Sequence, residues 1–347
     1  MAPVRRRASR RAGKGPTIAD VAREAGVSPM TVSRVVNKEG NVVEATREKV
    51  EAAIARIGYV PNPAARALAG ARQCRIALVH DNPSAAWLSA LLVGCLAQAS
   101  ESHAQLLVEN CDDPQDVARL VSRFAAARID GVILPPPLGD DQRLLAALRK
   151  VRMPFAQVAS GDPSPAADNA GIGERKAAQA MTRYLIDKGH RRIGFVRGNA
   201  KHSAAGLRQA GYEDALAEAG IAPDPALVAD GDFSYRYALD AAEHLLDLAE
   251  PPTAIFASND DMAAAVIAVA HRRGLDVPRD LAVCGFDDTA IATMIWPQLT
   301  TVRQPVDRMA RIATQMVIDA VRAERAGQPH KPRHEVLDFA LVERESA

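Results

Sequence analysis

Near its start the chain has two short stretches in which small apolar residues recur at helical spacing. Residues 18–25 place valine and alanine on one helical face, and residues 29–36 do the same with three valines. Thr17 can cap the first helix through its hydroxyl, and Ser28 can cap the second. Gly26 lies between them and supplies the backbone angles that a sharp turn needs. The pattern therefore predicts two short helices joined by a tight turn.

A third helix is predicted from Glu44 to Ile57, where Gly58 ends it. Residues 59–63 contain two prolines and cannot continue that helix. The alanine-rich residues 64–69 suit a short helix closed by Gly70, although six residues alone in water are barely helical because nucleation is costly. Composition alone favours the simpler alternative, which is a linker.

From residue 75 onward, short apolar runs alternate with amphipathic stretches. The predicted strands are 76–80, 105–109, 131–134, 155–159, 193–197, 228–230, 253–257 and 281–286. The helices between them include 114–128, 174–188 and 260–273. This alternation predicts parallel sheets covered by helices on both faces. So many strands exceed one small sheet, and we therefore expect two doubly wound α/β lobes.

Charge is distributed unevenly, although the whole chain carries a formal net charge of only +1. Residues 1–73 hold 14 Lys and Arg against 6 Asp and Glu, a net of +8, and the rest of the chain is net −7. A basic head on an acidic body indicates a polyanionic partner for the head alone. Residues 1–16 are rich in arginine and lack the apolar core of a signal peptide, so we expect a disordered basic arm.

Several classes of protein are disfavoured. No apolar run reaches the length of a membrane span. The four cysteines are scattered without metal-ligand spacing, which fits a reducing cytoplasm and predicts neither a disulfide nor a metal site. No nucleophile elbow, P-loop or zinc-protease motif occurs, and Gly171-x-Gly173 lacks the third glycine of a dinucleotide fingerprint. His190 precedes a strand and is expected to satisfy local groups. We therefore predict no catalytic residue and no cofactor.

The second predicted helix leaves polar groups for its ends and outer face. They are Ser28, Pro29, Met30, Thr31, Ser33, Arg34 and Asn37. Such a face can reach base edges and phosphates. A plain helical hairpin, in which serine and threonine only cap, fits the spacing alone equally well.

The sequence VAREAGVSPMTVSRVVN, from Val21 to Asn37, separates these two interpretations. It resembles the DNA-binding domain of the LacI/GalR family of bacterial transcription regulators, and the resemblance continues through residues 46–50 and 58–62. It implies a helix-turn-helix domain over residues 17–62, with its motif at 18–37. The second helix would then enter the major groove of DNA.

The resemblance also assigns roles to individual residues of this domain. Pro29, Met30, Thr31 and Arg34 would face bases. Phosphates would be anchored by Thr17, Ser33, Asn37, Tyr59 and Asn62. Residues 63–73 would be a hinge helix and linker, in which Leu68 matches the leucine that paired hinges insert into the minor groove. Apolar wedges of this kind unstack and kink a base step.

For the rest of the chain the resemblance implies two lobes like those of periplasmic sugar-binding proteins. The N-terminal lobe would comprise residues 74–172 and 304–332, and the C-terminal lobe residues 173–303 and 333–347. The chain would cross between the lobes three times, near residues 171–174, 302–305 and 332–334.

Two such lobes place a ligand crevice at the carboxyl ends of their strands. Polar groups follow three predicted strands, at Ser258-Asn259-Asp260, at Asp287-Asp288 and at Asp232-Phe233-Ser234. Asn and Asp can bond paired hydroxyls, and an aromatic ring can cover a sugar face. Helix capping is the alternative for Asn259, Asp260 and Asp288, and the sequence favours it for the two aspartates.

The resemblance favours four effector-binding residues: Arg208, Phe233, Asn259 and Asp287. Two departures from the pattern of sugar-binding relatives concern the ligand class. Gly206 stands where many relatives have arginine, and Ala159 stands where several carry an acidic ligand contact. Arg208 retains its place in the motif but can also face the protein rather than a ligand.

The combined prediction is a cytoplasmic repressor, a homodimer or tetramer, that binds a palindromic double-stranded DNA operator under the control of a sugar or sugar derivative. It has no membrane partner. A secreted solute-binding protein would share the lobes but have no use for the head, and an enzyme would need a catalytic constellation that is missing here. A regulator controlled by a protein partner, with a degenerate crevice, stays open.

Overall fold

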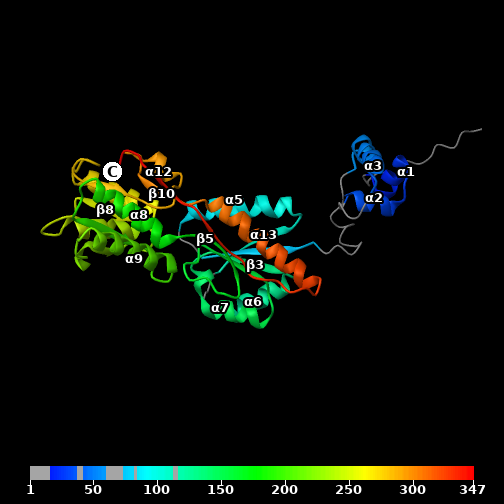
Figure 1. Cartoon of the computed structure of the whole chain (residues 1–347), viewed down its shortest axis with the longest axis horizontal. Coiled ribbons are helices and arrows are strands. Elements are labelled where there is room, and N and C mark those ends of the chain that lie inside the picture. The colour runs from blue at the N-terminus through cyan, green and yellow to red at the C-terminus, as the bar shows by residue number, and fades with distance from the viewer. Residues whose placement is uncertain (1–15, 37–41, 60–72, 82–83, 112–115) are drawn as a thin grey trace, which may run out of the picture. The chain divides into compact units, whose positions relative to one another are not determined.

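The computed structural model describes residues 16–36, 42–59, 73–81, 84–111 and 116–347. The chain divides into two compact units, Met1–Gln73 and Cys74–Ala347 (Figure 1). The predictions for the basic arm up to residue 15, for Asn37, for Asn62 and for the hinge with Leu68 lie outside the described residues.

The N-terminal unit is a three-helix domain made of α1 (Ile18–Ala25), α2 (Pro29–Val36) and α3 (Glu44–Ile57). Thr17 and Asp20 form a reciprocal capping box at the start of α1. Gly26 and Gly58 end α1 and α3 with positive φ angles of 66° and 64°, as the sequence predicts. The small core joins the three helices through Val21, Ala22, Val32, Val35, Val50, Ala53 and Tyr59.

The N-terminal lobe of the second unit is a parallel six-stranded sheet of order β11-β5-β4-β3-β1-β2. Its strands are β1 (Arg75–His80), β2 (Gln105–Asn110), β3 (Gly131–Leu134), β4 (Phe155–Val158), β5 (Asp168–Ile172) and β11 (His334–Leu337). Helices α5 (Ala85–Glu101) and α13 (Val306–Arg325) cover one face, and α6 (Val117–Ala126) and α7 (Gln142–Lys150) cover the other (Figure 1). A short 3-10 helix, η1 (Leu138–Asp140), follows β3.

The C-terminal lobe is a parallel four-stranded sheet of order β7-β6-β8-β9. Its strands are β6 (Ile193–Arg197), β7 (Val228–Asp230), β8 (Ala254–Ala257) and β9 (Ala282–Cys284). Helices α8 (Glu174–Asp187) and α9 (Ser203–Glu218) pack on one face, and α10 (Tyr235–Leu246) and α11 (Asp260–Arg272) pack on the other. The lobe also holds η2 (Pro225–Leu227), α12 (Ile291–Met294) and the antiparallel pair β10 (Thr301–Arg303) and β12 (Ala340–Val342).

The chain crosses between the lobes three times. The first two crossings follow β5 and β10, at the places that the sequence indicates. The third is corrected: β11 pairs in parallel with β5, from His334 beside Asn169 to Leu337 beside Ile172, so it extends the N-terminal sheet. The chain therefore crosses after Leu337 rather than near residues 332–334.

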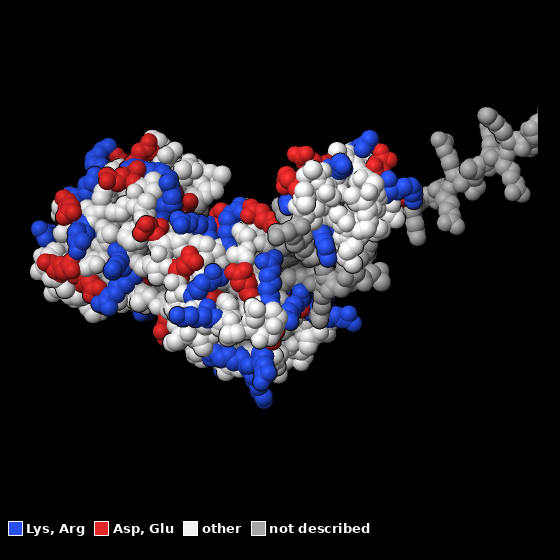
Figure 2. Space-filling model, turned by 45° about the vertical axis from the view of Figure 1, so that its right-hand side comes forward, with Lys and Arg blue, Asp and Glu red and all other residues white. Residues whose placement is uncertain are grey.

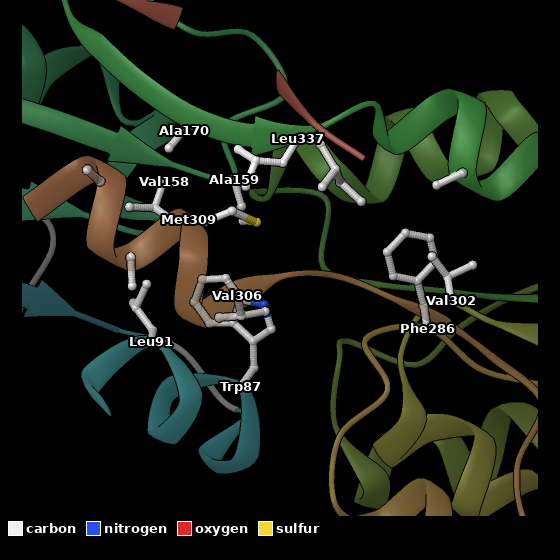
Figure 3. Close-up of a cluster of buried hydrophobic side chains, with 14 of the residues drawn as sticks. Trp87, Leu91, Val158, Ala159, Ala170, Phe286, Val302, Val306, Met309 and Leu337 are labelled. Carbon is white, nitrogen blue, oxygen red and sulfur yellow. The ribbon is translucent and has the colours of Figure 1, made fainter. Parts of the chain in front are cut away.

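Apolar side chains line the strand ends where the two lobes meet. Figure 3 shows Trp87 of α5 and Val306 of α13 on the N-terminal lobe, and Phe286 and Val302 on the C-terminal lobe. Figure 2 shows Lys and Arg interspersed with Asp and Glu over the visible face of this unit, so that this face carries charges of both signs. No helix in the described part of the chain is long and apolar enough to cross a bilayer.

Candidate functional site

The outer face of α2 is a compact polar surface around an exposed methionine. Ser28 caps the helix, because its hydroxyl accepts from the Thr31 backbone N–H at 3.1 Å, and the two hydroxyls lie 2.9 Å apart. Pro29 and Met30 follow in the first turn, and Met30 is 64% exposed. Ser33 is half-buried beside this surface. The apolar side of the helix is held by Val32 and Val35, so the N-terminal end of the polar side faces solvent.

Arg34 differs from the other arginines described in this unit. Arg23, Arg47 and Arg56 each form an ion pair with an acidic residue of the same unit. Arg34 is exposed and forms no such pair with the described residues. An unpaired guanidinium on a helix that can enter a groove is suited to bidentate contact with guanine or with phosphate.

Two of the predicted phosphate contacts are already engaged within the domain. The Thr17 hydroxyl donates to Asp20 Oδ2 at 2.7 Å, although the residue is exposed. Tyr59 is only 6% exposed and packs in the hydrophobic core of the domain. A phosphate contact from Tyr59 would therefore fall to its hydroxyl end, and both assignments stay predictions.

The second unit has a crevice between its lobes, at the carboxyl ends of both parallel sheets. All four predicted effector residues line it. The lining consists of Ser84, Trp87, Pro136, Ala159, His202, Ala204, Arg208, Phe233, Asn259, Asp287 and Gln304. Its open volume is about 40 Å³, space for a few water molecules, so a ligand of hexose size requires the lobes to separate.

Arg208 is the centre of a buried ionic network. Its Nε donates to Glu174 Oε2 at 2.7 Å, and its Nη1 donates to the Ser258 carbonyl and lies 3.7 Å from Asp287 Oδ1. Burial alone would lower the pKa of Arg208, but Glu174 and Asp287 raise it above its usual value. Burial also raises the pKa of Asp287, and Arg208 opposes this only in part. The guanidinium lies 3.7 Å from the ring centre of Phe286.

Asn259 caps α11, so the capping alternative is confirmed; it also lines the crevice, and its contact with an effector stays a prediction. Its Oδ1 accepts from the Met262 backbone N–H at 2.9 Å, and its Nδ2 donates to the Phe233 carbonyl at 3.2 Å. Phe233 packs over the backbone after β6, where a Cβ on Gly198 would lie 2.1 Å from the ring. Gly198 is thus required for the aromatic wall.

The two aspartates expected to cap helices have other roles. Asp260 accepts from Thr301 Oγ1 at 2.6 Å and from the Thr289 backbone N–H at 2.6 Å, which ties α11 to strand β10 and to the loop before α12. Burial raises the pKa of Asp260 to about 7. Asp288 is paired with Arg303 and Arg344. The capping interpretation of both residues is therefore wrong, because tertiary partners take their oxygens.

Backbone strain gathers at the crevice. Of the eight described residues other than glycine that have positive φ angles, five lie at strand ends beside the crevice, with φ between 53° and 112°: Ala159, Asp232, Phe233, Asp287 and Asp288. Such conformations cost about 1–3 kcal/mol each and are typical of ligand sites.

The two departures from the family pattern have different positions. Ala159 lines the crevice. Gly206 is exposed on α9 and does not line it, because Arg208 two residues later points to the buried side. The arginine of the motif, Arg208, therefore lines the crevice, and its contact with a ligand stays a prediction.

Several residues that line or support the crevice were missed by sequence reasoning. Trp87, His202 and Gln304 line the crevice, and Glu174 holds Arg208 from behind. Trp87 sits in an apolar helix where nothing distinguishes it from a core residue. Glu174 and Gln304 lie at the first two lobe crossings, and that position was the signal that could have found them.

Hydrogen bonds join the lobes on both sides of the crevice. Asp140 of the N-terminal lobe accepts from the backbone N–H and the hydroxyl of Ser203, the first residue of α9, at 2.9 and 2.8 Å. Ser203 Oγ in turn accepts from the Gly161 N–H at 2.7 Å. On the other side, Ser84 Oγ donates to Asp261 Oδ2 at 2.9 Å. These contacts hold the lobes in the closed arrangement.

The comparisons with known proteins agree with this geometry. Residues 17–62 match the bacterial regulatory proteins of the lacI family, and residues 182–347 match the periplasmic binding protein-like domain. Catabolite control protein A of Priestia megaterium is 35% identical over 310 residues, which cover 89% of this chain and 93% of that protein.

Two solved structures are similar over nearly the whole chain. The complex of the transcriptional regulator CelR with cellobiose has a TM-score of 0.73 at 33% identity, covering 96% of this chain and 100% of that one. The lac repressor dimer bound to operator and an anti-inducer has a TM-score of 0.72 at 29% identity, covering 96% and 99%.

A helix-turn-helix head on a two-lobed core of the periplasmic-binding-protein type defines a class of DNA-binding transcriptional regulators. Within that class, the identity and coverage of the relatives decide the family. The chain belongs to the LacI family of bacterial regulatory proteins.

Proposed function

We propose that the chain is a cytoplasmic repressor that binds a palindromic operator as a homodimer or tetramer. A sugar or sugar derivative that binds between the lobes would either weaken or strengthen this binding to the operator. The observation that carries the proposal is the convergence of Arg208, Phe233, Asn259 and Asp287 on one crevice. These residues come from separate parts of the C-terminal lobe. The similar CelR structure holds cellobiose, which supports a carbohydrate effector.

For the DNA side, the proposal assigns direct base contacts to the exposed N-terminal end of α2. Met30 would contact an apolar group such as a thymine methyl, and Arg34 would supply polar discrimination. The similar lac repressor structure holds operator DNA, which supports this assignment. Asn37, Asn62 and Leu68 complete the proposed DNA contacts as sequence-based assignments, and catalysis is not part of the function.

The test combines DNA binding with ligand binding. An operator selected from random double-stranded DNA is titrated with the full chain, and the titration is repeated with sugars that raise the melting temperature. A ligand at 100 times its dissociation constant adds about 2.7 kcal/mol of stability. Asp287→Asn should abolish the ligand response, and Asp240→Asn, an exposed change on α10, should leave it intact. The proposal is contradicted if selection from random DNA enriches no sequence, or if no bound ligand changes the affinity for the operator.

One observation favours a second candidate, a regulator controlled by a protein partner. The crevice is narrow, and Arg208, Asn259 and Asp287 each already form a hydrogen bond within the protein. In that case no sugar would shift the melting temperature, and operator affinity would change only on addition of a cell extract.

A further inference from the structure

Helix ends in the second unit follow one pattern, and three of them depart from it in the same way. After each of seven described helices the chain turns through a residue with a positive φ angle. After four of these helices that residue is a glycine, namely Gly189, Gly220, Gly274 or Gly327. After α5, α6 and α7 it is His103, Arg128 or Arg152, with φ of 54°, 52° and 54°. A residue with a Cβ is strained in this conformation and glycine is not, so three basic residues stand where the backbone favours glycine.

The helix ends themselves do not require a cation at this position. A positive charge near a helix C-terminus does offset the helix dipole. At the ends of α8 and α11, however, Lys188 and Arg273 lie one residue earlier, and the residue with positive φ after each is glycine. The strain at Arg128 and Arg152 therefore indicates a role outside their own helices, and strained backbone of this kind is typical of functional sites.

Arg128 and Arg152 lie at the end of the N-terminal sheet that is opposite the crevice. They come just before β3 and β4, which are neighbouring parallel strands, and the carboxyl ends of these strands are at the crevice. Arg149, at the end of α7, lines one hollow together with Arg152. Lys150 follows it on the same helix, and Lys331 comes just before β11 of the same sheet. We call Arg128, Arg149, Lys150, Arg152 and Lys331 the basal surface.

The basal surface has positive charge without matching negative charge, although residues 74–347 as a whole are net −7. All five of its residues are exposed, and none forms an ion pair with another described residue. Asp130 and Asp319, two carboxylates of this lobe, are already paired with Arg325 at 2.7 Å and with Arg333 at 3.0 Å. Glu324 is exposed beside the hollow and offsets only part of the charge. The basal surface is therefore suited to a polyanion.

The connection between the two units identifies the polyanion. The chain enters the second unit at this same end of the sheet, where β1 begins with Arg75 between β2 and β3. Residues 60–72 join the units, and a chain of that length spans at most about 50 Å. DNA that is bound by the N-terminal unit is thus tethered near the basal surface, whereas an acidic protein would have no such tether.

We propose that the basal surface binds the phosphate backbone of double-stranded DNA beside the operator. The proposal goes beyond the proposed function, in which every DNA contact comes from residues 17–68. The operator itself is covered by the N-terminal units, so the free phosphates are those of the flanking duplex. Arginine and lysine bind such phosphates without regard to base sequence, and they release counterions when they do so.

The test compares two duplexes with the full chain, by fluorescence anisotropy over a series of salt concentrations. One duplex is trimmed to the operator selected from random DNA, and the other extends the same operator by about 20 base pairs on each side. At low salt the extension should raise the affinity of the native chain by about 10-fold or more. It should also steepen the plot of log affinity against log salt by about 0.9 for each phosphate contact.

The decisive variant combines Arg128→Gly with Arg152→Gly. It should reduce the gain from the extension to less than about threefold and leave binding of the trimmed operator unchanged. Because glycine relieves the positive φ angle, the urea midpoint of this variant should be unchanged or higher, which a merely structural role of the arginines would not give. The matched control, Arg191→Gln with Arg236→Gln, removes two exposed arginines without ion pairs from the C-terminal lobe and should keep the whole gain.

The outcomes separate this inference from the proposed function. If the extension adds nothing to the affinity of the native chain, the inference is overturned, the operator-binding repressor stands, and the basal surface would suit an acidic protein instead. An equal loss of the gain in the glycine variant and in the control reduces the effect to net charge and also overturns it. A lower urea midpoint of the glycine variant overturns the argument from backbone strain. If the native chain binds neither duplex, the inference fails together with the proposed function.

Discussion

The buried pair between Arg208 and Glu174 allows a quantitative test of what holds the crevice in place. Arg208→Met keeps an unbranched apolar side chain but removes the guanidinium that lies over Phe286, and it leaves Glu174, which is 2% exposed, without its partner. Removing one member of a buried pair costs about 3–5 kcal/mol. Glu174→Gln should cost less, about 1–3 kcal/mol, because Arg208 still bonds the Ser258 carbonyl and lies near Asp287.

The double variant should lose less free energy of unfolding than the two single variants lose together. Contacting groups of one network couple by about 0.5–3 kcal/mol, and this pair should lie in the upper half of that range. Urea unfolding of the full chain at pH 7, followed by circular dichroism, gives the three free energies. Since the N-terminal unit can unfold separately, the transition of the two-lobed unit is the one analysed.

A matched control lies on the same two helices. Arg175 of α8 and Asp214 of α9 are 2.5 Å apart but exposed. Their double-mutant cycle should show only a small fraction of the coupling, because water screens the pair. Additive losses at Arg208 and Glu174, or equal coupling at both pairs, would refute the argument that burial makes the network strong.

Three further outcomes are expected. Gly206→Ala should stabilise the chain by up to about 1 kcal/mol, because the added Cβ meets nothing within 4 Å. Gly211→Ala on the same helix should destabilise the chain, because its Cβ would lie 2.1 Å from the Arg175 carbonyl oxygen. The urea concentration at the midpoint of unfolding should therefore rise in the first variant and fall in the second. His202 has a pKa lowered by burial from 6.5 to about 4, so the unfolded chain binds its proton first, and the stability that neutral His202 contributes is lost as the pH falls from 6.5 to 4. Relative to His202→Gln, the native chain should lose ~3 kcal/mol over that interval, and parallel pH profiles would exclude this account. Met30→Gln should change the preferred base at the position it contacts when operators are selected from a random pool; an unchanged site would remove Met30 from base readout.

The sequence predicted well those helices and strands whose own residues carry both a regular apolar pattern and a clear stop signal. The bounds of α3, β3, β6 and β7 agree with the periodicity, because each is an apolar pattern with its own stop signals. Strand β5 was missed because it begins with Asp168 and Asn169, which read as a turn. Asp168 is buried only because His330 and the Arg333 backbone bond its carboxylate. Such distant partners are invisible in a local pattern.

The candidate site shows the same division. The four residues that we propose to bind the effector were predicted from the family resemblance, and they line one crevice. Trp87 and Gln304 were missed, because their place depends on how the lobes close rather than on neighbours in sequence. The third crossing was misplaced for a related reason: β11 is an exposed edge strand whose pairing with β5 is set by the sheet.

Helix α9 belongs to the C-terminal lobe, but its first residue is bonded to the N-terminal lobe. Its first residue, Ser203, is held by Asp140 of the opposite lobe, and Arg208 on the same rigid helix contacts the crevice about 7.5 Å further along its axis. A change in the first two turns of α9 therefore alters ligand affinity and lobe coupling together. Phe233 and Asn259 are not on α9, because they follow strands β7 and β8. An engineer who wants a new ligand without a new switching response should thus redesign the crevice from the β7 and β8 side and leave α9 untouched.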